Sequence, residues 1–313
     1  MSGSGVLTLA HSHMKYVRQA RLLARSIRHA GSQMPLAVAT DLAPALFQDL
    51  FDIVIPWKFD RWPGVLSKLD LAAFTPFETT LFIEADCLCL RPVETVFDYF
   101  AGQEFAVYGT NPSSLFWTAK PERYRTVVDA KAYPHFNGGL YYFRNTPLAW
   151  DVFERAKGFF EQYDALGVLC YRRKPNDEPL FSLAMASLGL KASDDPAMVV
   201  MSEPEPPAFA VDLDVLRGHC SFMRHGRRVE PAIIHFVDIR DRIAAYRREG
   251  LVLKLIVGKG WPVATRPLLA LIANVMSFAD WAMHRPGELV AHQVRRIFSK
   301  VRWRISKWVT SRR

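Results

Sequence analysis

The sequence has 313 residues, of which 50% are apolar and 23% are charged. This composition excludes a disordered chain, and the length is enough for one large globular domain with an appendage. The formal net charge of +9 is unevenly placed. Residues 251–313 carry 12 Lys and Arg against 2 Asp and Glu, whereas residues 1–250 carry 28 against 29. A binding role for positive charge therefore concerns the C-terminal segment.

The cysteines and the N-terminus bear on the compartment. Cys87 and Cys89 are only two residues apart on a strand end, too close and too parallel to bridge easily. No Cys-x-x-Cys indicates a structural zinc site, and residues 1–5 lack the basic and apolar regions of a signal peptide. We therefore expect a reduced, cytoplasmic setting. The longest apolar run, residues 267–279, is expected to be too short to span a bilayer comfortably.

The N-terminal residues alternate between apolar runs and amphipathic stretches. This pattern predicts three strands and two intervening helices, over residues 5–10, 14–30, 35–40, 43–50 and 52–55. A βαβαβ order favours an α/β fold with a parallel, doubly wound sheet. His11 and His13 follow the first strand, either as nucleotide contacts at the helix start or as exposed loop histidines. No Gly-x-Gly-x-x-Gly is present there, which weighs against a dinucleotide site.

Two acids follow a continuous apolar run that is predicted to be a buried strand. A helix over residues 65–74 carries Lys68, whose amine could neutralise a phosphate or simply be solvated, and a buried strand follows at residues 81–83. Glu84 and Asp86 come next, with the i, i+2 spacing that points two strand side chains the same way. Ligands of α/β sheets lie beyond the carboxyl ends of the strands. The pair is either a Mg²⁺ or Mn²⁺ site for a diphosphate, or two acids at the mouth of a sheet.

Further polar residues stand at element ends later in the chain. Helices are predicted over residues 93–100 and 147–166 and from residue 176 onward, and strands over residues 104–108, 140–143 and 232–236. Asn137, before two glycines, suits either a ligand contact or an ordinary Asn-Gly turn. Asp177 and Glu178 are favourable helix-start residues even without a function. His235 lies near a strand end, either as a core histidine or as a metal ligand beside the two acids, and an imidazole ligand would suit Mn²⁺ better than Mg²⁺.

In order along the chain, these stretches resemble glycosyltransferases of the GT-A fold, close to glycosyltransferase family 8 and its bacterial relatives. The resemblance covers roughly residues 5–240 and rests on five motifs, namely the opening strand and helix, residues 76–86, Phe136–Leu140, Asn176–Leu180 and Ile233–Phe236. It implies a Rossmann-like, mostly parallel sheet flanked by helices, spanning residues 1–250. Residues 251–313 would then form a helical, basic appendage.

The resemblance also implies a reaction and its residues. Glu84, Asp86 and His235 would hold Mn²⁺ or Mg²⁺, and the metal would stabilise charge on the leaving nucleoside diphosphate. The implied sugar-facing, catalytic residues are Asn137, Asp177 and Glu178. The implied contacts to the nucleotide-sugar, expected to be a UDP-sugar, are Thr8, Leu9, Ala10, Lys68, Gly138 and Gly139.

The sequence departs from the family pattern at two places. Glu84 replaces the usual first Asp, which puts its ligation of the metal in doubt. The family's Gly-Lys-Pro-Trp is absent after His235, so a lysine contact to the diphosphate is either missing or supplied by Lys68, Arg240 or Arg242.

The C-terminal segment has the pattern of a membrane-surface helix. From residue 289 to 313, apolar residues recur every three or four positions and Arg and Lys occupy much of the remaining circumference. The stretch from Leu268 to Met283 is a candidate second, partly embedded helix. We expect either peripheral attachment to the inner face of the plasma membrane, beside a glycan or lipid-linked acceptor, or a helix packed on the body with a solvated basic face.

Two other functions fit parts of this pattern. A nucleotidyltransferase can share the nucleotide fold and the metal, but its Gly-rich, basic signature near the first strand is absent. A non-catalytic GT-A scaffold that binds membranes would use the basic tail alone. Nucleic-acid binding is not expected, because the body is near neutral.

Overall fold

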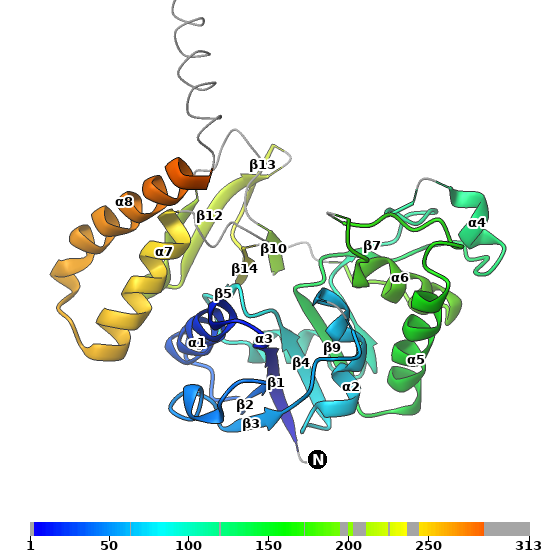
Figure 1. The fold of residues 1–313 in the computed structure, drawn as a ribbon, viewed down its shortest axis with the longest axis horizontal. Helices are drawn as coiled ribbons and strands as arrows, with labels where there is room; N and C mark the ends of the chain where they lie inside the picture. Colours follow the sequence, from blue (N-terminus) through cyan, green and yellow to red (C-terminus); the bar gives the residue numbers. More distant parts are fainter. Residues whose placement is uncertain are drawn as a thin grey trace, which may run out of the picture.

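The computed structural model describes residues 3–62, 64–118, 120–171, 173–194, 200–202, 211–224, 226–236 and 244–284, with the backbone alone for 200–202 and 281–284. Its main sheet has the strand order β3-β2-β1-β4-β9-β6 (Figure 1). Those strands are β1 Ser4–Leu9, β2 Leu36–Thr40, β3 Ile53–Pro56, β4 Thr79–Ile83, β6 Phe105–Ala106 and β9 Leu140–Arg144. Strands β1 to β4 run parallel, which confirms the predicted α/β fold with a mostly parallel sheet.

Strand β9 runs antiparallel to both β4 and β6, a direction that the apolar pattern does not predict. The register pairs Ile83 with Leu140, and the Glu84 amide donates to the Gly139 carbonyl at 3.0 Å. The carboxyl end of β4 therefore lies beside the start of β9. This direction brings the acidic turn and the two glycines to one edge of the sheet.

Helices cover both faces of the main sheet. Helices α1 (Met14–His29) and α3 (Glu94–Tyr99) pack over one apolar layer, with core residues such as Val6, Leu81 and Ile83. The helices α2 (Leu71–Phe74), α4 (Pro121–Arg125), α5 (Pro147–Glu161) and α6 (Asp177–Ser187) contribute to the other layer. Figure 1 shows α1 and α5 on opposite sides of the strands. The alternation of apolar residues along buried strands supplies both layers.

Two predicted helices are shorter than expected. Residues 43–50 contain only a 3₁₀ turn, η1, over Pro44–Leu46. Residues 65–74 divide into a 3₁₀ helix, η2 (Gly64–Asp70), and the single turn of α2. Apolar spacing in such short segments suits a 3₁₀ turn as well as an α-helix, so periodicity alone could not separate them.

Three smaller sheets complete the described fold. Strand β14 (Ile233–His235) pairs parallel with β10 (Val200–Ser202) and antiparallel with β5 (Cys87–Cys89). A second small sheet pairs β7 (Gly109–Thr110) with β8 (His135–Phe136). A third contains β11 (Asp212–Asp214), β12 (His219–Arg224) and β13 (Arg227–Val229), and the 3₁₀ turn η3 (Val215–Arg217) connects β11 to β12. The β14–β5 pairing places His235 opposite Cys87, the residue that follows Asp86.

The C-terminal helices pack against these smaller sheets. Helix α7 (Ala244–Leu251) continues without a break into a π-helical stretch, η5 (Val252–Val257), and α8 (Arg266–His284) follows the short η6 (Val263–Thr265). Apolar residues from both sides of position 250 share one core with Leu88 and Phe236. The division into residues 1–250 and 251–313 therefore stays a prediction from composition, and the basic tail from residue 285 lies outside the described residues.

Charged side chains tie α8 to the rest of the fold. Glu249 is fully buried and pairs with Arg248, and its Oε1 lies 3.1 Å from Arg266 Nη2. Arg266 also pairs with Asp214. Arg247 pairs with Asp280 farther along α8.

One stretch of the described chain, residues 263–280, is long and apolar enough to cross a membrane by length and composition, with mean hydropathy 1.2 and 11% of it buried. The expectation that this apolar run is too short is thus wrong on those two measures, because the helix extends beyond residues 267–279. Its large outward-facing side chains are Leu268, Leu271, Ile272, Val275, Met276 and Phe278. Leu269 and Ala273 face inward.

Candidate active site

The two predicted acids and the predicted histidine meet at the end of β4. His235 Nε2 lies 2.8 Å from Glu84 Oε2 and 3.2 Å from Asp86 Oδ1. Glu84 and Asp86 stand on the turn between β4 and β5 rather than on a continuing strand, yet both carboxylates reach the same imidazole atom. The antiparallel β5–β14 ladder fixes this approach by pairing His235 with Cys87. The predicted cluster of Glu84, Asp86 and His235 therefore exists in the structure.

The predicted Asn137-Gly138-Gly139 turn orients the histidine. Asn137 Oδ1 accepts from the Gly139 amide at 2.8 Å and lies 2.7 Å from His235 Nδ1. Because an amide oxygen only accepts, Nδ1 carries the proton in this contact. A Cβ atom on Gly139 would lie 2.5 Å from His235 Nδ1, closer than real contacts allow. Glycine at this position lets the turn approach the imidazole.

Lys68 is a buried bridge between the acids rather than a solvated lysine. Its Nζ lies 2.8 Å from Glu84 Oε1, 2.8 Å from Asp177 Oδ2 and 3.1 Å from the Gly138 carbonyl oxygen. The side chain is only 5% exposed. Lys68 thus joins the β4 turn, the glycine turn and the start of α6.

The start of α6 supplies two more carboxylates. Asp177 is buried, and its Oδ2 also accepts from the Tyr141 hydroxyl at 2.6 Å. Glu178 accepts from the Gly138 amide at 2.8 Å through Oε1 and from Trp117 Nε1 at 3.1 Å through Oε2. Both carboxylates therefore have partners outside their own helix, beyond what helix-start residues require.

Burial raises the pKa of three of these acids. Asp177 and Asp86 each lose hydration, which outweighs Lys68 beside the first and His235 beside the second. Burial also raises the pKa of Glu178, with the nearby Asp177 charge adding to the effect. Perturbed carboxyl groups that gather at a strand end are typical of functional sites.

Ion pairing dominates the other charged groups of the cluster. Burial would raise the pKa of Glu84, but Lys68 and His235 hold it at about 2. Burial would likewise lower the pKa of His235, but Asp86 and Glu84 raise it to about 10. The same two-sided balance raises the pKa of Lys68, since Asp177 and Glu84 outweigh its burial. Without a further cation, the cluster carries its positive charge on Lys68 and His235.

The donor set fits a divalent cation such as Mn²⁺. Ligand atoms of Asp86, Cys87 and His235 lie within 4.8 Å of one another, and Glu84 Oε2 also reaches the imidazole. The contact of Nδ1 with Asn137 leaves Nε2 as the ligand atom, the arrangement usual for metal-binding histidines. Glu84 is shared with Lys68, so it is the less available carboxylate. Burial raises the pKa of the Cys87 thiol well above its usual value, which disfavours a thiolate ligand.

The predicted nucleotide contacts at the end of β1, Thr8, Leu9 and Ala10, are buried. Leu9 and Ala10 pack in the two apolar layers, and Thr8 is buried with no hydrogen-bond partner for Oγ1 among the described residues. His11 stacks on Phe59 with ring centroids 4.2 Å apart. His13 instead caps α1 by accepting from the Lys15 amide.

Sequence reasoning missed three neighbours of the cluster, Tyr141, Cys87 and Trp117. Tyr141 is the second residue of β9, and its sequence neighbours do not distinguish it from a core aromatic. Trp117 lies in a loop far from Glu178 in the sequence, so only the fold brings its indole to that carboxylate. Cys87 directly follows Asp86, and that adjacency was a signal that could have been read.

No family model matches this chain, and no curated protein matches its sequence. Among solved structures, the galactosyltransferase LgtC in complex with donor and acceptor sugar analogs is similar, with 14% identity, a TM-score of 0.53, and coverage of 85% of this chain and 99% of that chain. An active-site mutant of LgtC gives the same values. A mouse xyloside xylosyltransferase 1 is less similar, with 14% identity, a TM-score of 0.43, and coverage of 75% and 97%. Together with the strand order described above, the likeness to LgtC shows that this chain resembles the glycosyltransferases and has their GT-A fold.

Proposed function

We propose that the protein is a metal-dependent glycosyltransferase that moves a sugar from a nucleotide-sugar, a UDP-sugar, to a glycan or lipid-linked acceptor. The observation that carries this proposal is the convergence of Asp86, His235 and Glu84 at the end of β4, beside the glycine turn and the start of α6. Two carboxylates and an oriented imidazole suit Mn²⁺. They suit Mg²⁺ less well, because Mg²⁺ prefers oxygen ligands to an imidazole nitrogen.

Each part of the cluster has a role in this proposal. A bound metal ion supplies Lewis-acid stabilisation of the charge on the leaving diphosphate. The Gly138-Gly139 turn gives the donor close access to the backbone. Asp177, fixed between Lys68 and Tyr141, and Asn137, fixed by Gly139, orient the donor sugar by hydrogen bonds to its hydroxyl groups. The shared contacts hold these side chains in place before a ligand arrives.

The proposed nucleotide site lies at the end of β1 rather than at Lys68. Lys68 pairs with Asp177 and Glu84, so it balances the charge of these acids more directly than it would neutralise a diphosphate. The Thr8–Ala10 edge and His11 lie at the carboxyl end of β1, where α/β sheets bind nucleotides. We propose that His11, stacked on Phe59, extends this edge toward the base.

Calorimetric titration with nucleoside diphosphates, in Mn²⁺ and in chelator, tests the proposal. We expect binding of one diphosphate, UDP, that requires metal and is lost in Asp86→Ala. The control is Asp98→Ala, which removes an exposed carboxylate on α3 and should bind like the wild type. If no diphosphate binds to the folded protein, a non-catalytic scaffold replaces the enzyme. If a nucleoside triphosphate instead transfers its nucleoside monophosphate to an acceptor and releases diphosphate, a nucleotidyltransferase replaces it.

We further propose that the protein works at the cytoplasmic face of the plasma membrane, attached peripherally by its C-terminal segment. The support is the outward apolar row of α8, including Leu271, Val275 and Phe278, together with the net charge of +10 over residues 251–313. Flotation with vesicles rich in phosphatidylserine tests this attachment. Deletion of residues 286–313 should abolish flotation, and Val275→Glu should weaken it. Unchanged flotation after the deletion contradicts the proposal.

A further inference from the structure

The 3₁₀ helix η2 carries three polar side chains that are almost inaccessible to solvent. Ser67 and Asp70 are 4% and 6% exposed, and Lys68 between them is buried as described above. A buried polar group is unfavourable unless it has partners, so the partners of each side chain show what it holds in place. Lys68 holds the acid cluster, and the contacts of the other two lead elsewhere.

Ser67 connects η2 to the end of β1. Its Oγ donates to the Gly64 carbonyl at 2.9 Å and lies 3.4 Å from His11 Nε2. His11 in turn stacks on Phe59, in the loop after β3. One face of η2 therefore meets the proposed nucleotide edge, one residue before the chain reaches Lys68.

Asp70 connects the other end of η2 to helix α5 and to the loop after β3. Its Oδ1 lies 3.2 Å from Lys157 Nζ on α5, and its Oδ2 accepts from Trp62 Nε1 at 2.7 Å. The Lys157 side chain is only 11% exposed, so water screens this ion pair little. The Trp62 ring also meets the Phe160 ring of α5 edge-on, with centroids 5.3 Å apart. Asp70 thus fastens η2 to a long, regular helix.

A 3₁₀ helix of this length needs such an anchor. Its hydrogen bonds are poorer than those of an α-helix, and runs longer than about three or four residues are uncommon. Helix η2 has 7 residues, and the single turn of α2 that follows adds little, since isolated helices this short are unstable. The side-chain contacts of Asp70 are therefore needed to keep η2, and with it Lys68, in one position.

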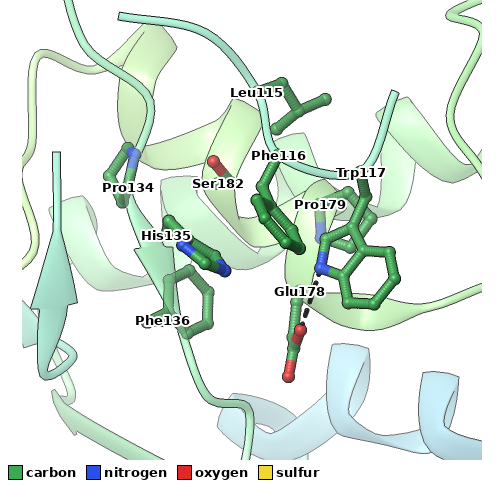
Figure 2. Close-up of a pocket in the computed structure, with 9 residues that line it drawn as sticks. All are labelled: Leu115, Phe116, Trp117, Pro134, His135, Phe136, Glu178, Pro179 and Ser182. Carbon is green, nitrogen blue, oxygen red and sulfur yellow. Dashed lines mark hydrogen bonds between the residues drawn. The ribbon is translucent and has the colours of Figure 1, made fainter. Parts of the chain in front are cut away.

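Lys68 is the side chain through which this anchor reaches the site. Two acids of the cluster, Asp177 and Glu84, share its ammonium group at 2.8 Å each. Glu178 is held separately by the indole of Trp117, which donates to it from the loop before α4 (Figure 2). A shift of η2 would therefore move the cation away from the first two acids, whereas Glu178 would keep the contact with Trp117.

On the basis of the proposed transferase function, we propose that Asp70 is a positioning residue for the donor site. Its contacts with Lys157 and Trp62 hold η2 against α5, and η2 holds Lys68 between Asp177 and Glu84. Asp70 thereby sets the affinity for the nucleotide-sugar through Lys68, without contacting the ligand. The charge of Lys157 is part of this function, because it is the cation that keeps Asp70 in place.

Proton–nitrogen NMR of the lysine ammonium groups in the full, ligand-free chain tests this role directly. A buried ammonium group in hydrogen bonds exchanges its protons slowly with water, and the loss of one signal in Lys68→Met identifies that of Lys68. Asp70→Asn keeps the shape of the side chain and removes its charge. It should speed proton exchange at Lys68 on the order of tenfold, because a lost charge-assisted contact favours local opening. Lys157→Met should do the same, and Lys157→Arg should retain slow exchange.

Calorimetric titration with UDP in Mn²⁺ gives the second readout. Asp70→Asn and Lys157→Met should each weaken the Kd by about fivefold, a usual size for residues that act on a site without touching its ligand. Lys157→Arg should bind UDP like the wild type. The matched control is Glu154→Gln, which removes the other partner of Lys157, an acid that is 60% exposed, and should change neither readout.

A destabilised variant separates positioning from stability. Arg266→Met removes a contact to buried Glu249 among the C-terminal helices, so it should lower Tm and leave the exchange at Lys68 unchanged. Equal acceleration in Arg266→Met, or slow exchange in both Asp70→Asn and Lys157→Met, would overturn the positioning role. A weaker Kd with slow exchange would overturn it as well, since Asp70 would then act by another route. If exchange responds as expected but the wild type binds no UDP, the donor assignment fails and the role of Asp70 in holding Lys68 stands.

Discussion

Replacing Lys68 by Met tests whether the buried cation holds the acids together. The substitution keeps the length of the side chain and removes only the charge and its three contacts. Asp177, whose side chain is 2% exposed, then loses its cation, and Glu84 loses one of two. Removing one partner of a buried pair costs about 3–5 kcal/mol. At about 2 °C per kcal/mol for a chain of this size, Tm should fall by about 6–10 °C.

Differential scanning calorimetry measures this loss, and Arg155→Met serves as the control. Arg155 pairs with Asp151 on α5 at 3.2 Å, but both side chains are more than 40% exposed. An exposed pair of this kind contributes about 0.3–0.5 kcal/mol, so Tm should change by no more than about 1 °C. If the Tm of Lys68→Met falls no further than the Tm of Arg155→Met, the acids do not depend on the buried lysine and the reasoning is wrong.

The pH dependence of Lys68→Met provides a second readout. Burial already raises the pKa of Asp177, and Lys68 opposes that rise, so its removal should raise the pKa further. At a pH between the pKa of Asp177 in the unfolded chain and its higher pKa in the folded variant, the folded protein binds more protons than the unfolded chain. The free energy of unfolding therefore falls as pH rises through this window. The deficit should be larger at pH 8 than at pH 5, and Lys68→Met with Asp177→Asn should recover part of it at pH 8.

Three further changes test the packing of the site and of two other parts of the fold. Gly139→Ala places a Cβ atom 2.5 Å from His235 Nδ1, so metal-dependent UDP binding should be lost by calorimetry, whereas Gly158→Ala meets open space and should not alter it. Gly5→Ala places a Cβ atom 2.3 Å from the Phe77 ring, and the overpacking should cost about 1–3 kcal/mol in urea unfolding. Arg266→Met removes charged contacts to buried Glu249 and should cost about 1.5–3 kcal/mol, whereas an unchanged unfolding midpoint would contradict this.

The sequence is informative about the fold where a buried strand and a long amphipathic helix are involved. The apolar run at residues 81–83, just before Glu84, is observed within β4, and the periodic stretch from Met14 is observed as α1. Such signals are local, because strand and helix periods differ. The direction of β9 was not predictable in this way, since an apolar run is the same in parallel and antiparallel pairing.

The residues of the site were predictable by type and position, but their contacts were not. Glu84, Asp86 and His235 stand at strand ends, a place with a known chemical bias. Lys68 was expected to face phosphate or solvent, and the structure instead buries it among three acceptors. That outcome depends on the pairing of β9 and on the approach of α6. The residues around Lys68 predict neither the pairing of β9 nor the approach of α6.

The pairing of β5 with β14 has a consequence for the order in which the protein is made. Leu88 pairs with Ile234, so the acidic turn leaves the ribosome long before the strand that completes it. A nascent chain that has reached the end of α6 contains Lys68, Asp177 and Glu84, but it lacks His235. Closing contacts so distant in sequence costs more chain entropy than closing local ones. The cation site that we propose would thus be complete only once nearly the whole GT-A body has emerged.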